Sequence, residues 1–122
     1  MSAGRPVVLL VDDEAHILSA LQRVLRREPY EVLTAANSVD ALALLAQRVI
    51  AVVVSDQKMP GTSGVALLRE VAARFPATKR ILLTGWPEEI PEGEREVAKL
   101  EAILPKPWDE AVLKQTLQRC VA

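Results

Sequence analysis

Aromatic residues are nearly absent from this chain of 122 residues, in which two Trp, one Tyr and one Phe make up 3% of the sequence. Because 50% of the residues are nonetheless hydrophobic, the core is predicted to consist of Val, Leu, Ile and Ala side chains. Cysteine occurs once, as Cys120, which excludes an internal disulfide bond and is typical of a reducing compartment. These shortages predict a cytoplasmic protein with an aliphatic core.

A surplus of either charge is also missing. The 15 basic and 16 acidic side chains give a formal net charge of −1, so the sequence has no electrostatic footprint for direct binding to nucleic acid. Near the start, the apolar run Val7–Val11 is followed at once by acidic residues and is too short for a signal peptide or a membrane span. We therefore expect a protein that binds neither nucleic acid nor membranes.

The length predicts one domain over residues 1–122, in which residues 1–6 form a loose leader. Short apolar segments rich in β-branched residues predict five strands. They cover residues 7–11, 30–35, 52–56, 79–83 and 102–104. A segment with helical periodicity follows each strand, which predicts an α/β fold with a parallel sheet, right-handed crossovers and helices on both faces.

The helix between the fourth and fifth strands is the least regular. Pro87, Pro91 and Gly93 interrupt this stretch, so we expect the fourth helix to be short or irregular, covering about residues 94–101.

Polar side chains follow four of the five predicted strands. They are Asp12 and Asp13 after the first, Asp56 at the third, Thr84 after the fourth and Lys106 after the fifth. Parallel strands end at one edge of the sheet, which is where ligands bind in open α/β folds. Three carboxylates at that edge would repel one another, and a hard divalent cation such as Mg²⁺ would relieve the repulsion. The sequence therefore predicts a divalent metal site at this edge.

A metal ion, an ammonium group and a hydroxyl group are also what a phosphoryl group needs for transfer, with Asp56 as its covalent acceptor. Each residue taken singly has a simpler explanation. Asp12 or Asp13 could cap the first helix, Asp56 could be a loop acid, and Thr84 and Lys106 could be a strand-end hydroxyl and a solvated charge. Their convergence on one edge favours the chemical site.

With these residues in place, the chain resembles the receiver domain of bacterial two-component response regulators, from Val7 to Cys120. Four motifs carry the resemblance, each at a strand end: VDDE (11–14), SDQKMPGTSG (55–64), LLTG (82–85) and LPKPWDE (104–110). The resemblance implies a flavodoxin-like (CheY-like) five-stranded parallel sheet with strand order 2-1-3-4-5.

The resemblance also implies roles for the site residues. The implied phosphoacceptor, switch hydroxyl and ion partner of the phosphoryl group are Asp56, Thr84 and Lys106. The implied Mg²⁺ ligands are the carboxylates of Asp12, Asp13 and Asp56 and the main-chain carbonyl of Lys58. The Lys106–Pro107 peptide bond is expected to be cis, as it often is in this family.

Partners follow from the same resemblance. A sensor histidine kinase or a phosphotransfer protein would supply the phosphoryl group, and the domain would catalyse only its own phosphorylation and dephosphorylation. No output domain is visible in the sequence. The DQ-x-MPG, LTG and KPWD motifs resemble receivers that often precede HD-GYP phosphodiesterase or ATP-driven transcription-activator modules, so an output domain in a longer parent chain is an open expectation. Formation of a homodimer on phosphorylation is a second open expectation.

Some positions depart from the family pattern. In this family an aromatic residue on the fifth strand commonly acts as a switch by turning its ring inward. Ile103 occupies that position here, so coupling through an inward-turning ring is missing. Lys58 and Trp86 lie two residues after Asp56 and Thr84, at positions that tune dephosphorylation in this family. We expect Trp86 to shield the acyl phosphate from water and Lys58 to add charge at the rim.

Three other functions remain as alternatives. A pseudo-receiver would bind partners without phosphorylation, and the irregular fourth helix keeps that option open. A haloacid-dehalogenase-type phosphatase would need an acid two residues after its Asp nucleophile. Lys58 occupies that position after Asp56, whereas Glu14 follows Asp12 at the required spacing. A flavodoxin-like cofactor carrier would need a Ser/Thr/Gly-rich phosphate loop after the first strand, which is absent.

Overall fold

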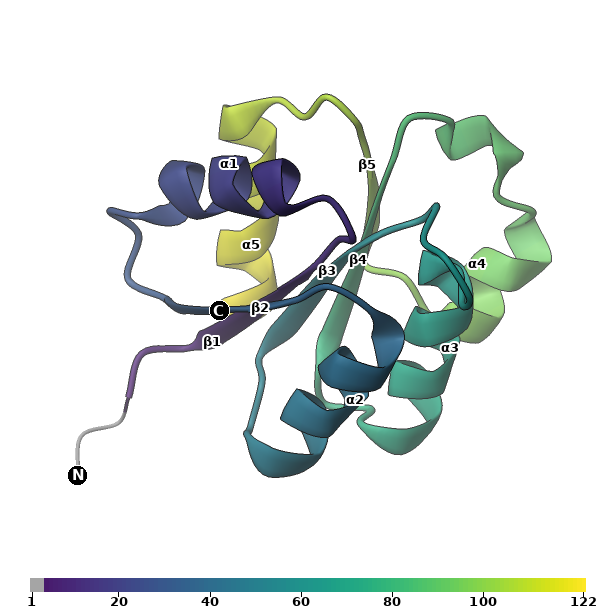
Figure 1. Ribbon diagram of the computed structural model, residues 1–122, viewed down its shortest axis with the longest axis horizontal. Helices are drawn as coiled ribbons and strands as arrows, with labels where there is room; N and C mark the ends of the chain where they lie inside the picture. The colour runs from purple at the N-terminus through teal and green to yellow at the C-terminus, as the bar shows by residue number, and fades with distance from the viewer. Residues whose placement is uncertain (1–3) are drawn as a thin grey trace.

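Strands and helices alternate along the chain, as the sequence predicts, in a computed structural model that describes residues 4–122 (Figure 1). The strands are β1 (Val7–Val11), β2 (Glu31–Ala35), β3 (Val52–Asp56), β4 (Lys79–Thr84) and β5 (Ala102–Pro105). The helices are α1 (Ala15–Leu25), α2 (Ser38–Gln47), α3 (Gly64–Arg74), α4 (Glu92–Ala98) and α5 (Glu110–Val121), with a 3₁₀ turn η1 (Pro87–Glu89) before α4. All strand pairs are parallel and the order is β2-β1-β3-β4-β5, which confirms the expected topology.

The beginning of the chain lies partly outside this description. Residues 1–3 of the predicted leader are outside the described residues, and residues 4–6 precede β1 without regular secondary structure. Among residues 4–122, none of the helices combines the length and the apolar character that crossing a membrane requires.

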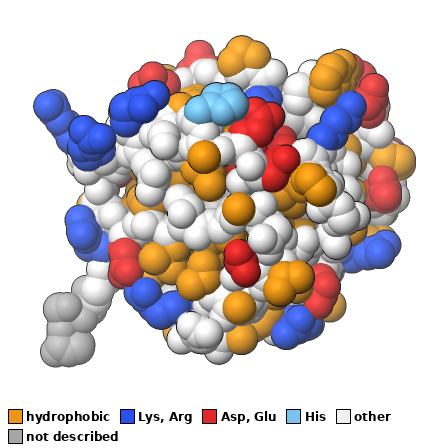
Figure 2. All heavy atoms as spheres, in the orientation of Figure 1, with side chains coloured by type: hydrophobic (Ala, Val, Ile, Leu, Met, Phe, Trp, Pro, Cys, Tyr) orange, Lys and Arg blue, Asp and Glu red, His pale blue; other side chains and the backbone are white. Residues whose placement is uncertain are grey.

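Two hydrophobic cores cover the two faces of the sheet (Figure 1). Side chains alternate along β1, so that Leu9 packs in the core under α2, α3 and α4, and Leu10 packs in the core under α1 and α5. All five side chains of β1 and of β3 are buried, as expected for central parallel strands. The buried hydrophobic side chains of both cores are aliphatic apart from Tyr30, and Phe75 and Trp108 pack partly buried against them, which agrees with the composition. On the face shown in Figure 2, acidic and basic side chains are interspersed between apolar ones.

Side-chain caps start three of the helices. Asn37 accepts from the N–H of Asp40 at 2.8 Å, and Asp109 accepts from the N–H of Val112 at 3.0 Å. Ser63 does the same for α3, accepting from the N–H of Ala66. These short polar side chains satisfy N–H groups that lack a partner inside the helix.

The alternative role of Asp13 as a cap of the first helix is wrong. Glu14 is the N-cap residue of α1 and no side chain caps that helix among the described residues. Asp12 instead accepts from the N–H of Glu14 at 2.9 Å, so it holds the turn between β1 and α1. Asp13 is left exposed beside it.

The fourth helix is short, as expected, but its bounds differ from the predicted ones. It begins at Glu92 and ends at Ala98, because Lys99 adopts a left-handed conformation with φ of 51°. The N–H of Lys99 bonds back to the carbonyls of Arg95 and Glu96, and that of Leu100 bonds to the carbonyl of Arg95, which closes the helix. A non-glycine residue in this conformation is not foreseeable from composition.

Arg80 on β4 is an unexpected buried cation, with only 5% of its surface exposed. Its Nε donates to the carbonyls of Ala98 at 2.9 Å and Lys99 at 3.2 Å, and its Nη1 donates to that of Thr78. Burial lowers the pKa of the guanidinium below its ordinary value. The positive charge meets the carbonyl end of α4, where a helix favours cations. Arg80 therefore anchors the end of α4 to the sheet.

An Arg80→Met variant should lose about 2–3 kcal/mol of unfolding free energy, because the carbonyls of Ala98 and Thr78, whose bonds to Arg80 are buried, would lose this donor. Urea unfolding at neutral pH measures the loss. Arg74→Met is the matched control. Its partner Glu70 is an exposed i,i+4 neighbour, and such pairs are worth about 0.5 kcal/mol or less. Equal losses in the two variants would contradict the anchoring role.

Candidate functional site

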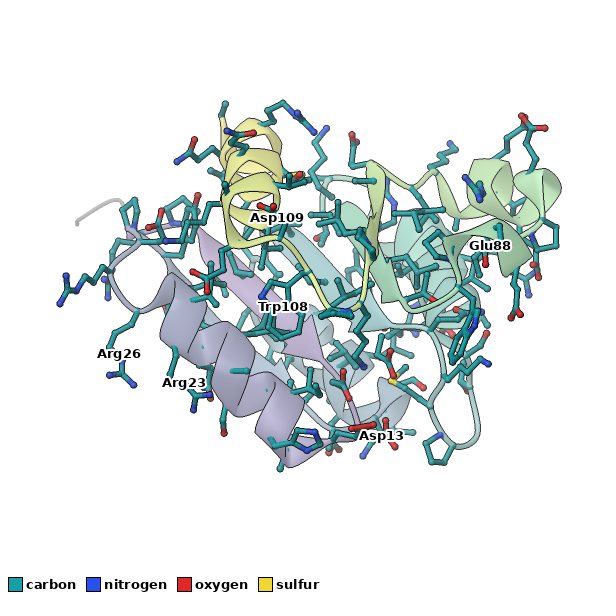
Figure 3. All side chains as sticks on the ribbon, turned by 90° about the horizontal axis from the view of Figure 1, so that it is seen from above. Asp13, Arg23, Arg26, Glu88, Trp108 and Asp109 are labelled. Atoms are coloured by element: carbon teal, nitrogen blue, oxygen red, sulfur yellow. The ribbon has the colours of Figure 1, made fainter. Side chains whose placement is uncertain are left out.

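The residues expected at the carboxyl edge of the sheet lie at the ends of four adjacent strands. Asp12 follows β1, Asp56 ends β3, Thr84 ends β4 and Lys106 follows β5. The strand register aligns Asp56 with Leu83 of β4, so Thr84 lies one residue further along the edge. Figure 3 shows Asp13 at this edge, where β1 gives way to α1.

Three carboxylates form a compact acidic cluster. One oxygen each from Asp12, Asp13 and Asp56 lies within 4.8 Å of the other two. Asp12 and Asp56 are buried, with 1% and 7% of their surfaces exposed, whereas Asp13 faces solvent. Oxygen donors with one open side suit a divalent cation such as Mg²⁺, which keeps several of its waters. The donor set thus fits the expected metal.

Lys106 joins the two buried carboxylates. Its Nζ lies 3.0 Å from Asp12 Oδ2 and 3.0 Å from Asp56 Oδ1, across 94 and 50 residues of sequence. Burial by itself lowers the pKa of Lys106, but its bonds to Asp12 and Asp56 outweigh burial and the pKa is raised. Lys106 therefore stays an ammonium. The Lys106–Pro107 peptide bond is cis, which confirms that expectation.

The ionised form of Asp56 is less stable than that of an exposed aspartate. Burial raises the pKa of Asp56, the bond from Lys106 lowers it, and the charge of Asp12 raises it again, with a net upward shift. A buried carboxylate close to a second one is a common arrangement at functional sites. A group that supplies positive charge would stabilise this cluster.

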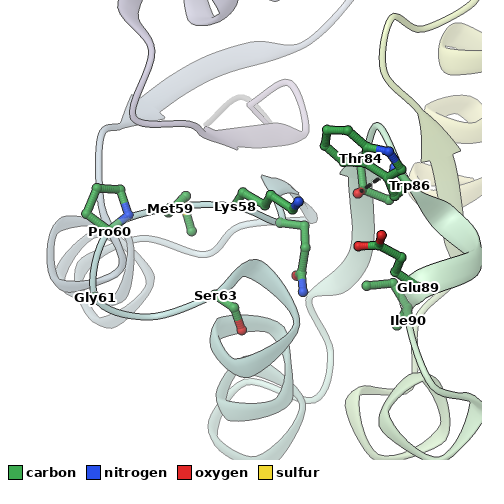
Figure 4. Close-up of a pocket in the computed structure, with 10 residues that line it drawn as sticks. Lys58, Met59, Pro60, Gly61, Ser63, Thr84, Trp86, Glu89 and Ile90 are labelled. Atoms are coloured by element: carbon green, nitrogen blue, oxygen red, sulfur yellow. Dashed lines mark hydrogen bonds between the residues drawn. The ribbon is translucent and has the colours of Figure 1, made fainter.

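Thr84 is buried, but its hydroxyl is turned toward its own loop. Its Oγ1 accepts from the main-chain N–H of Trp86 at 3.2 Å, the dashed line in Figure 4. Among the described residues no hydrogen bond joins Thr84 to Asp56. The structure therefore brings Asp12, Asp13, Asp56 and Lys106 into one cluster and places Thr84 at its border.

The loop between β3 and α3 is held by Gln57 and Gly64, which sequence analysis did not single out. The N–H of Gly64 donates to the carbonyl of Gln57 at 2.9 Å, and Gln57 Oε1 accepts from the N–H of Val65 at 2.8 Å. A Cβ atom on Gly64 would lie 2.1 Å from the main-chain oxygen of Asp56. Only glycine fits there. The sequence signal that could have identified Gly64 was its place at the end of the SDQKMPGTSG motif.

A cleft of about 520 Å³ opens beside the cluster, between the β3–α3 loop and the segment that follows β4. Figure 4 shows its walls, which are Gln57, Lys58, Met59, Pro60, Gly61, Ser63, Thr84, Trp86, Glu89 and Ile90. Across its rim, Lys58 Nζ lies 4.0 Å from the centroid of the Trp86 ring. Sequence analysis expected both residues near the site but missed that they contact each other.

Comparisons with known proteins give matches over nearly the whole chain. A family model described as the response regulator receiver domain matches residues 8–118. The chain is 39% identical, over 99% of its length, to the hydrogenase transcriptional regulatory protein HoxA of Cupriavidus necator. It spans 25% of that relative's length.

Solved structures give the same picture. The signal receiver domain of an HD domain-containing protein from Pseudomonas fluorescens matches with a TM-score of 0.88 and 33% identity, covering 99% of this chain and 90% of that one. The response regulator protein TrrA of Thermotoga maritima, solved in complex with Mg²⁺-BeF, matches with a TM-score of 0.86 and 28% identity, covering 94% and 98%.

Proposed function

Because this chain belongs to the family of response regulator receiver domains, we propose that Asp56 is its phosphoacceptor in two-component signalling. The observation that carries the proposal is the convergence of Asp12, Asp13, Asp56 and Lys106 at one end of the sheet. The three carboxylates and the main-chain carbonyl of Lys58 would hold the Mg²⁺ ion.

The buried carboxylate of Asp56 is the nucleophile. One of its oxygens forms a bond to the phosphorus of a phosphohistidine as the P–N bond breaks, and the leaving imidazole keeps the electron pair and takes a proton from water. Bound Mg²⁺ supplies positive charge for the phosphoryl oxygens. Lys106, already 3.0 Å from Asp56, needs only a small movement to pair with the new phosphoryl group. The domain thus catalyses its own phosphorylation and is no classical enzyme.

Thr84 responds to the new group. Its hydroxyl leaves the N–H of Trp86 and donates to a phosphoryl oxygen, so the segment after β4 moves with it. One added dianionic group thereby biases two arrangements of a loop, which is how phosphorylation switches act in general. The hydrogen bond between the Thr84 hydroxyl and the N–H of Trp86 is the starting arrangement of this proposed switch.

The partners of such a domain are a phosphodonor and an output. The domain acts in the cytoplasm, where a sensor histidine kinase or a phosphotransfer protein supplies the phosphohistidine. The chain spans about a quarter of a transcriptional regulator and resembles the receiver of an HD domain-containing protein. Both findings support an output domain of one of these kinds in a longer parent chain, with a phosphorylation-dependent homodimer as a further expectation.

Phosphoryl uptake should require a divalent cation. Intact mass after incubation with acetyl phosphate should show one added phosphoryl group with Mg²⁺ and essentially none with a chelator, because the three carboxylates would otherwise repel the donor. An Asp13→Asn variant should need more Mg²⁺ for the same uptake. A protein that takes up no phosphoryl group under any condition would be a pseudo-receiver, and sustained hydrolysis of a phosphate ester would indicate the phosphatase alternative.

A further inference from the structure

Lys58 and Trp86 form a bridge between two loops. The ammonium of Lys58, in the β3–α3 loop, lies 4.0 Å from the centroid of the Trp86 ring, in the segment after β4 (Figure 4). This distance is well within the reach of a cation–π interaction. Trp86 is 50% exposed, so the bridge lies at the protein surface. We call this pair the clasp.

The main chain of Trp86 is tied to the site as well. Its N–H donates to Thr84 Oγ1 at 3.2 Å, which keeps the hydroxyl turned toward the loop. Trp86 therefore touches the β3–α3 loop with its ring and the switch hydroxyl with its backbone. If Thr84 turns toward a phosphoryl group on Asp56, this hydrogen bond is lost and the backbone that carries the ring is released.

The released segment is coupled to α4. The guanidinium of Arg95 donates to the carbonyls of Pro87 at 2.8 Å and Ile90 at 3.1 Å, so the turn after Trp86 and the helix are joined. Ile103 on β5 has no ring that could follow the Thr84 hydroxyl. The aromatic ring that lines the cleft next to Thr84 is that of Trp86.

We propose that the clasp stabilises the unphosphorylated conformation, and that phosphorylation opens it. This inference rests on the proposed function, because the movement of Thr84 needs a phosphoryl group on Asp56. Lys58 and Trp86 are then positioning residues. Their contact joins the loop that carries the proposed metal ligand Lys58 to the loop that follows Thr84, and it opposes the active arrangement. A clasp present in one state only must lower the affinity of the site for a phosphoryl mimic.

Beryllofluoride with Mg²⁺ is a stable probe for this linkage, and the relative TrrA was solved with that combination. The experiment is a double-mutant cycle of Lys58→Met, Trp86→Leu and the double variant, with the dissociation constant for beryllofluoride measured by calorimetry at saturating Mg²⁺. Both substitutions change side chains at the rim and leave the Lys58 carbonyl in place. The cycle cancels independent effects, such as the lost charge of Lys58 or lost shielding by Trp86.

The expected result is a dissociation constant of the wild type two- to fivefold higher than the other three proteins imply by additivity. That factor corresponds to about 0.5–1 kcal/mol for an exposed cation–π pair, at 1.4 kcal/mol per tenfold. Additive affinities, or a wild type that binds more tightly than additivity implies, would overturn the proposal. Additive affinities would mean that the clasp persists in the active state, and tighter binding by the wild type would mean that it forms there.

Unfolding of the same four proteins without beryllofluoride separates the clasp from the proposed function. The clasp predicts a two- to fivefold coupling in the unfolding equilibrium constant in favour of the intact pair. Additive unfolding would refute the clasp whether or not beryllofluoride binds. Coupled unfolding in a protein that binds no beryllofluoride would instead refute the proposed function and the opening step, while the contact itself would stand.

Discussion

Replacing Asp56 with Asn should abolish phosphoryl uptake from acetyl phosphate completely, while the domain stays folded. An amide oxygen is a poor nucleophile, and the remaining carboxylates have other tasks: Asp12 is bound to Lys106 and to the N–H of Glu14, and Asp13 is exposed at the rim. Intact mass after incubation with acetyl phosphate and Mg²⁺ measures the loss.

Asp109→Asn is the matched control, because Asn also caps helices well and this residue lies at the start of α5, away from the acidic cluster. This variant should take up one phosphoryl group as the wild type does. If Asp56→Asn still gained a Mg²⁺-dependent phosphoryl group, Asp12 or Asp13 would have to be the acceptor and the assignment would fail.

The Asp56→Asn variant should also be at least as stable as the wild type at pH 7 without divalent cations. Burial raises the pKa of Asp56, so the folded state binds its proton more tightly than the unfolded state does. Ionised Asp56 therefore costs stability, and the cost grows as pH rises from the ordinary Asp range through the raised pKa. Urea unfolding should show the advantage of Asp56→Asn at pH 7 and its disappearance at acid pH.

Gly64→Ala should be the most damaging of the glycine-to-alanine substitutions in the chain. Its Cβ would lie 2.1 Å from the main-chain oxygen of Asp56 and 2.8 Å from Leu82 Cδ1, where no real Cβ fits. The β3–α3 loop would have to move, at a cost of about 3 kcal/mol or more. Because the displaced peptide belongs to Asp56, a shift of about 1 Å should also slow phosphorylation by about 100-fold.

Gly93→Ala provides the control for this substitution. A Cβ on Gly93 meets nothing within 4 Å, and the residue lies in the first turn of α4. Alanine has the better helix propensity, so the change should be neutral or stabilising by up to about 1 kcal/mol. Urea unfolding and acetyl phosphate kinetics of both variants test the prediction, which fails if Gly64→Ala is tolerated as well as Gly93→Ala.

Features of the fold that depend on local pattern could be predicted. The apolar run of β1 and the helical stripes around it indicated strand and helix because hydrophobic periodicity follows directly from backbone geometry. The irregular α4 was expected from its prolines and glycine, but its end at Ala98 was not, because the left-handed Lys99 is set by contacts around it. The burial of Arg80 was missed for the same reason, since its partners are carbonyls of α4.

The sequence by itself determined that Asp12, Asp13, Asp56, Thr84 and Lys106 share one edge, because parallel strands place their carboxyl ends together whatever the packing details. Only the tertiary structure decided which of them touch. It placed Lys106 at 3.0 Å from both buried carboxylates, turned the Thr84 hydroxyl to Trp86, and set Lys58 over the Trp86 ring. The contacts of Lys106 and of Lys58 join segments distant in sequence, and the Thr84–Trp86 bond lies within one loop whose course those contacts constrain. Their geometry follows from how the cores pack beneath them.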